Sequence, residues 1–132
     1  MPLVVDVSVM MGWHFEDEKS AAADAVRAKL LTDEVLVPAH WWFELRNVLL
    51  VGERRGRASP EDTAGFLDDL RELSISIALL PDENAVLALA RRHRLSFYDA
   101  AYLELAKREG VSLATFDNDL IAAAKAERVP LA

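Results

Sequence analysis

Four acidic residues stand in apolar stretches of the chain: Asp6, Glu44, Asp99 and Asp117. Moving a carboxylate out of water costs several kcal/mol unless it is paired, hydrogen-bonded or bound to a metal. Each of these acids therefore either reaches solvent at the end of its element or shares a site that compensates its charge.

The first acid lies in the stretch Leu3–Val9, which is apolar and rich in β-branched residues. This composition predicts a strand buried on both faces, with Asp6 near its carboxyl end. Ligands bind at that end of the strands in open α/β sheets. The alternative is that Asp6 only caps the turn or helix that follows.

The second acid lies on a predicted helix from about Ala39 to Arg55 that is apolar nearly all round. Such a helix is buried in the core or in a subunit contact. On this helix, Val48 and Val51 lie on the same face as Glu44, and so does Asn47, one turn after it. A carboxylate on this face should be paired or coordinated, and a salt bridge to an arginine elsewhere is the alternative.

The third acid begins another predicted helix, from about residue 97 to 109. Asp99 stands at capping-box spacing from Ser96, which is a structural explanation by itself. The helical row from Asp99 nevertheless runs through Tyr102, Leu103 and Ala106, which is a core face. A capping acid need not point into the core, so both interpretations stay open.

The fourth acid follows a predicted strand. Asp117 could be the N-cap of the next helix, because aspartate is among the best capping residues. Asp119, in the first turn of that helix, is most simply a partner of the helix dipole. Like Asp6, however, Asp117 stands at the carboxyl end of a strand.

The joint pattern is more informative than any one acid. Two acids stand at carboxyl ends of predicted strands, and two stand near the starts of helices beside that edge. Clustered carboxylates cannot all ionise near neutral pH without compensation, and their oxygens suit Mg²⁺ or Mn²⁺. Two such ions roughly 3.5–4 Å apart stabilise the attacking and leaving oxygens of a phosphoryl displacement. No covalent nucleophile is evident, so metal-bound water would attack, as in a phosphodiester hydrolase.

The elements that must position these acids alternate between strands and helices. Besides the strand Leu3–Val9, strands are predicted at 35–37, 74–80 and 111–115, with a short final one at about 129. Further helices are predicted at about 20–31, 59–73, 84–94 and 117–127. This alternation predicts an α/β fold, with a central parallel sheet of four or five strands and helices on both faces.

Length and composition limit the function classes. The 132 residues suit a single domain over 1–132, and the absence of cysteine excludes disulfides and thiolate metal sites. No apolar run reaches the roughly 18 residues of a membrane span, and no signal peptide is evident, so a cytoplasmic location is expected. The net charge of −7 argues against non-specific nucleic-acid binding.

Four motifs together resemble the PIN-domain ribonucleases, above all the VapC-type toxins of bacterial and archaeal toxin–antitoxin pairs. In order and spacing they are Asp6-Val7-Ser8, Glu44-Leu45-Arg46-Asn47, Tyr98-Asp99-Ala100-Ala101-Tyr102-Leu103 and Thr115-Phe116-Asp117. The third motif is fairly specific, and the resemblance covers the whole chain.

The resemblance implies a Mg²⁺- or Mn²⁺-dependent endoribonuclease that cuts single-stranded or loop regions of RNA, often tRNA or rRNA. It also implies a homodimer and a small antitoxin that occupies the active-site groove. By matching positions, Asp6, Glu44, Asp99 and Asp117 would be the catalytic and metal-binding residues. The supporting residues would be Ser8, Asn47, Thr115 and Asp119.

Two groups of arginines could hold the RNA backbone: Arg46, Arg54, Arg55 and Arg57, or Arg91, Arg92 and Arg94. A solvated helix end is the simpler explanation for any one of them.

The sequence also bears on four other functions. A haloacid-dehalogenase-like phosphatase is rejected because Ser8 stands where a second aspartate is required, and a receiver domain lacks its acidic pair and late lysine. A non-catalytic PIN-like protein-binding module and a housekeeping RNA-processing nuclease stay open.

Overall fold

The structure, a computed structural model, describes residues 1–132. Its centre is one four-stranded parallel sheet in the order β3-β2-β1-β4. The strands are β1 (Leu3–Val5), β2 (Val35–Val37), β3 (Ile75–Ile77) and β4 (Ser112–Ala114). The helices are α1 (Val7–His14), α2 (Ala21–Lys29), α3 (Trp41–Arg54), α4 (Pro60–Arg71), α5 (Glu83–His93), α6 (Phe97–Glu109) and α7 (Asn118–Ala126), with a 3₁₀ turn, η1 (Glu16–Glu18), after α1.

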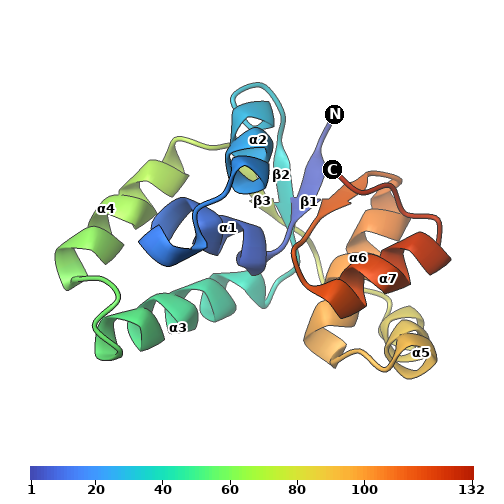
Figure 1. Ribbon diagram of the computed structural model, residues 1–132. Coiled ribbons are helices and arrows are strands. Elements are labelled where there is room, and N and C mark those ends of the chain that lie inside the picture. Colours follow the sequence, from blue (N-terminus) through green and yellow to red (C-terminus); the bar gives the residue numbers. More distant parts are fainter.

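Helices cover both faces of the sheet. In Figure 1, α1 to α4 form the layer on one side and α5 to α7 the layer on the other. Alternate residues of β1 face the two layers: Leu3 and Val5 pack in the core under α1 to α4, whereas Val4 packs under α5 to α7. The predicted α/β class and the sheet covered on both faces are therefore confirmed. No helix is both long enough and apolar enough to cross a membrane.

The strand order changes direction at β1. From β1 the chain crosses to β2 and then β3 on one side, whereas β4 lies against the other side of β1. Val5 stands beside Ala114, and the Asp6 N–H donates to the Ala114 carbonyl at 2.9 Å. The carboxyl ends of β1 and β4 thus form the switch point at which open α/β sheets bind ligands.

The predicted strand over Leu3–Val9 is wrong beyond Val5. Asp6 is the extended N-cap residue of α1, and the helix begins at Val7. Val7, Val9 and Met10 are all buried in this helix, so burial in the core outweighs their preference for strands. The correction leaves Asp6 at a strand end.

Most other predicted elements are confirmed within a few residues. Ser59 and Asp62 form a complete capping box at the start of α4, and α6 has the predicted bounds. The strand predicted over 74–80 is shorter and lies at the edge of the sheet. The predicted final strand is reduced to a bridge between Leu131 and Leu113.

The apolar sequence of α3 predicts a helix that is buried in the core or in a subunit contact. In the structure, only one side of the helix is buried. Trp41, Leu45 and Leu49 enter the core, while Phe43 on the opposite side is 72% exposed and Leu50 is also exposed. An outer helix packs only against the layer beneath it, so three of the eight large apolar residues of α3 (Trp42, Phe43 and Leu50) are exposed.

The packing of α3 on α1 needs a glycine. A Cβ at Gly52 would overlap the ring of Phe15, which is 1% exposed and contacts the His14 ring and the Arg57 guanidinium. To admit a methyl group at Gly52, this packed ring would have to shift.

We expect Gly52→Ala to lower the free energy of unfolding by about 1–2 kcal/mol, because overpacking outweighs the gain in helix propensity. Urea denaturation followed by circular dichroism measures the change. Gly65→Ala is the matched control, since no atom lies within 4 Å of its Cβ position in the exposed part of α4, and it should stabilise by about 0.5–1 kcal/mol. Equal effects of the two substitutions would contradict the packing argument.

Candidate active site

Asp6 lies at the end of β1 and is 5% exposed. Its Oδ2 accepts hydrogen bonds from Ser8 Oγ at 2.9 Å and from Thr115 Oγ1 at 2.7 Å. The structure shows no capping bond from its side chain to α1, so the capping explanation does not account for it. Two hydroxyls therefore hold this carboxylate in one orientation at the switch point.

The same two hydroxyls connect the loop after β4 to Asp6. Ser8 Oγ accepts from the Phe116 N–H at 3.0 Å, and Thr115 Oγ1 accepts from the Asp117 N–H at 3.1 Å. Ser8 and Thr115 thus each donate to Asp6 and accept from a backbone N–H of the loop after β4. Ser8 and Thr115, two of the supporting residues that the resemblance implies, are therefore both bonded to Asp6.

Glu44 extends from the first turn of α3. It forms no salt bridge with an arginine, which was the alternative that the sequence left open. Its Oε1 accepts from the Tyr102 hydroxyl at 2.6 Å, and His40 Nε2 lies 3.8 Å away. Tyr102 is fully buried, and burial beside this carboxylate raises the pKa of its phenol, which stays protonated and donates. One oxygen of Glu44 is thus held by Tyr102.

Asp99 lies in the first turn of α6. Its N–H donates to Ser96 Oγ at 3.0 Å, but the return bond that would complete a capping box is absent. Burial raises the pKa of Asp99, and the charges of Asp6, Asp117 and Asp119 raise it further. The carboxylate of Asp99 is therefore near enough to these acids to feel their charges.

Asp117 is the N-cap of α7, as the alternative explanation predicts. Its Oδ1 accepts from the Leu120 N–H at 2.9 Å. Asp119 is exposed in the next turn and lies close enough to act on the pKa of Asp99. Capping engages one oxygen of Asp117 and leaves its charge at the switch point.

These acids have no cationic partner. No lysine or arginine forms an ion pair with any of the four, and the nearest basic group is His40 beside Glu44. Burial is the largest cause that raises the pKa of Asp6, and the pKa values of Glu44 and Asp99 are raised by burial and then by neighbouring acids. The cluster therefore repels itself electrostatically.

The donor set consists of carboxylate and hydroxyl oxygens, which suit a hard divalent cation. No three acidic or histidine side chains come close enough together to hold one ion directly. Mg²⁺ keeps several of its waters in proteins, so a site with one or two direct carboxylates and further water-mediated ones fits this spacing.

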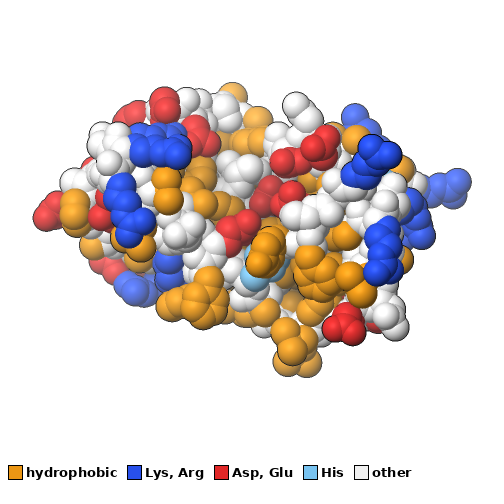
Figure 2. Space-filling view, turned by 90° about the horizontal axis from the view of Figure 1, so that it is seen from below, with side chains coloured by type: hydrophobic (Ala, Val, Ile, Leu, Met, Phe, Trp, Pro, Cys, Tyr) orange, Lys and Arg blue, Asp and Glu red, His pale blue; other side chains and the backbone are white.

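Figure 2 shows the face at the carboxyl ends of the strands, with acidic side chains gathered at its centre and Lys and Arg mostly at its two ends. Hydrophobic side chains and a histidine border the acidic centre. Although the net charge of the chain is −7, this face therefore carries positive charge on both sides of its acidic centre.

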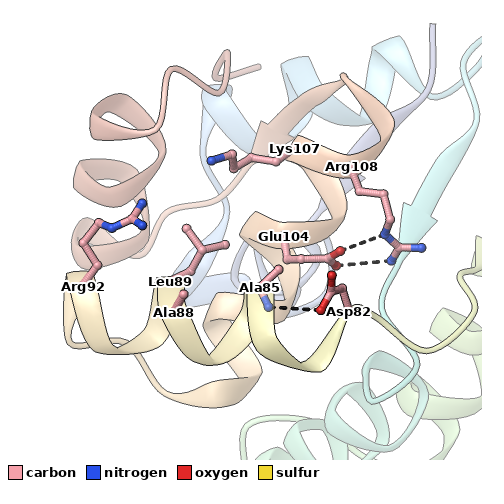
Figure 3. A pocket seen from close by; sticks show the side chains of 8 residues that line it. All are labelled: Asp82, Ala85, Ala88, Leu89, Arg92, Glu104, Lys107 and Arg108. Atoms are coloured by element: carbon pink, nitrogen blue, oxygen red, sulfur yellow. Dashed lines mark hydrogen bonds and ion pairs between the residues drawn. The ribbon is translucent and has the colours of Figure 1, made fainter.

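The arginines predicted to hold RNA lie in different surroundings. Arg46 stacks on the Trp42 ring, with its guanidinium carbon 4.0 Å from the ring centroid. Arg92 donates to Glu127 at 2.7 Å and lines a cavity of about 430 Å³ between α5 and α6. Figure 3 shows Arg108 turned back on Glu104 there, while Lys107 extends away from Arg108 and Arg92 stands at the opposite end of the cavity. None of the four acids lines this cavity.

Two residues of the site were missed from sequence. The sequence pattern assigns Tyr102 only to a core face and gives His40 no role. The available signals were the spacing of Tyr102 one helical turn after Asp99 and of His40 one turn before Glu44.

The fold is that of a PIN domain, and the family model for the PIN domain matches residues 3–126. The chain belongs to the PIN-domain family. It is 30% identical to Ribonuclease VapC3 of Pyrobaculum aerophilum over 123 residues. This alignment covers 91% of this chain and 92% of that protein. The chain is 32% identical over 118 residues to Ribonuclease VapC3 of Mycobacterium tuberculosis, with 89% and 84% covered.

Solved structures show the same fold. PAE2754 from Pyrobaculum aerophilum superposes with a TM-score of 0.73 at 24% identity, over 93% of this chain and 84% of that one. FitAcB from Neisseria gonorrhoeae gives a TM-score of 0.64 at 17% identity, over 98% and 95%. VapC20 of Mycobacterium tuberculosis, a toxin that cleaves the sarcin–ricin loop, gives 0.57 at 15% identity, over 92% and 94%.

Proposed function

We propose that this protein is a Mg²⁺- or Mn²⁺-dependent endoribonuclease that acts as the toxin of a toxin–antitoxin pair. The observation that carries the proposal is the group of uncompensated acids at the switch point of the sheet. Two relatives that match nearly the whole chain are named ribonucleases, which supports the same chemistry.

In this proposal Asp6 and Asp99 are the main metal ligands, and Glu44 and Asp117 complete the site directly or through waters. A bound divalent ion would lower the pKa of a water and orient the scissile phosphate. Ser8 and Thr115 hold the Asp6 carboxylate in place, as their hydrogen bonds indicate. Second-sphere contacts of this kind orient ligands at metal sites.

The substrate proposed is tRNA or rRNA, which makes the cytoplasm the expected location. Asn47 and Asp119 would assist at the rim of the site, and Arg46, Arg91 and Arg92 would contact the RNA backbone. The proposal for Arg92 requires that it exchange its bond to Glu127 for a phosphate. A homodimer and a cognate antitoxin are the proposed protein partners, and size-exclusion chromatography at micromolar concentration tests the dimer.

The direct test incubates the purified protein, freed of any partner, with total tRNA and rRNA. We expect discrete fragments with Mg²⁺ or Mn²⁺, none with EDTA, and none from Asp99→Asn. Absence of both cleavage and divalent-metal binding in the folded protein would contradict the proposal and favour a PIN-like protein-binding module. Toxicity on expression that a neighbouring gene product relieves would distinguish a toxin from a housekeeping nuclease.

A further inference from the structure

A second cavity opens directly beside the acidic centre. It has a volume of about 300 Å³ and is lined by His40, Phe43, Glu44, Asn47 and Tyr98, from the starts of α3 and α6. Glu44 belongs both to this cavity and to the group of four acids. The cavity is therefore continuous with the place where a scissile phosphate would lie.

Two aromatic side chains at this cavity are largely solvent-exposed. Phe43 is 72% exposed and Tyr98 is 61% exposed, so neither serves the core. Tyr98 is nevertheless supported from behind, because its ring lies 5.2 Å from that of His40, which meets Tyr102 edge-on at 5.2 Å. Exposed rings held in place beside a polar site indicate a surface that binds something flat.

Among the polar side chains of the cavity, Glu44 is bonded to Tyr102, whereas His40 and Asn47 make no side-chain hydrogen bond within the protein. The Nε2 atom of His40 is buried without a hydrogen bond, which costs about 1–3 kcal/mol when it stays unsatisfied. The amide of Asn47 is exposed, and such an amide both donates and accepts hydrogen bonds.

We propose that the cavity of His40, Phe43, Asn47 and Tyr98 is a nucleobase subsite, which takes one unpaired base of the RNA next to the scissile phosphate. Phe43 and Tyr98 stack on the base, and Asn47 bonds its edge. This inference rests on the proposed ribonuclease function.

The charges favour a base over the RNA backbone in this cavity. Glu44 repels a phosphate, and neither Lys nor Arg lines the walls. Aromatic faces accept any base, whereas an amide discriminates among base edges. A base must leave its stack to enter, so the substrate here is a single-stranded or loop nucleotide.

The test uses the Asp6→Asn protein, in which cleavage is stopped and the cavity is intact. It is titrated with single-stranded RNA oligonucleotides that each carry 2-aminopurine at one position, whose fluorescence falls when the base stacks on an aromatic ring. We expect quenching at one position only. Adding Tyr98→Ala or Phe43→Ala should remove that quenching and weaken RNA binding by about 5- to 100-fold.

Controls separate stacking from general damage. Tyr98→Phe keeps the ring and should keep the quenching, and Phe97→Ala removes an exposed aromatic on the same turn that does not line the cavity. Two results would overturn the subsite: RNA that binds with no position quenched, or quenching that survives both Tyr98→Ala and Phe43→Ala. Either result would leave the ribonuclease proposal unaffected. These results would be expected if the cavity binds an aromatic peptide segment instead of a base. Absence of any RNA binding overturns both.

Discussion

Replacing Asp6 by asparagine is expected to lower RNA cleavage by more than about 100-fold, because loss of a contact that merely orients a metal ligand already costs about 10- to 100-fold. Asparagine keeps an oxygen that can accept from Ser8 and Thr115 but removes the charge that would bind the cation. Fragment yield from tRNA and rRNA at several Mg²⁺ concentrations measures the effect.

The same substitution should leave the fold intact. Burial raises the pKa of Asp6, so the ionised carboxylate is unfavourable in the metal-free protein, and a neutral amide of the same shape avoids that cost. The thermal midpoint without metal should therefore stay the same or rise. Asp24→Asn, an exposed acid on α2, is the matched control and should cleave normally. Full activity in folded Asp6→Asn protein would refute the proposed role.

The largest stability effect outside the core is expected at Glu127, whose side chain is 8% exposed just after α7. Its two oxygens accept from Lys107 at 2.6 Å, from His93 at 2.6 Å and from Arg92 at 2.7 Å. These bonds, chiefly that of Lys107, lower the pKa of Glu127 to about 2. The residue therefore joins α5, α6 and α7 at a helix end where an unpaired acid would be unfavourable.

We expect Glu127→Gln to lower the free energy of unfolding at pH 7 by roughly 1–3 kcal/mol. The folded pKa lies below the unfolded value, so the stabilisation is fully present above about pH 5 and is lost as the pH falls toward 2. The difference between the variant and the original protein should shrink over that range.

Urea denaturation at pH 7 and pH 3 measures both quantities. Glu109→Gln, which removes an exposed acid near the end of α6, should change neither. A difference of the same size at both pH values would mean that the ion pairs are not its source.

The order of elements and their type could be predicted from sequence because they depend on local patterns. The capping box of Ser59 and Asp62 and the glycine at 110 mark helix ends within a few residues, and periodicity marks the apolar faces. The misassignment of Val7–Val9 as strand shows the limit of such patterns, because a fully buried helix and a buried strand are both apolar throughout.

The sequence by itself determined the α/β class and placed the four acids at element ends near one edge of a sheet. Only the tertiary structure decided how they are held. Thr115 reaches Asp6 because β4 pairs with β1, and Tyr102 reaches Glu44 across 58 positions of sequence because α6 and α3 meet at that edge. Such contacts depend on which strands become neighbours, and strand order is set by the packing of both helical layers rather than by any local pattern.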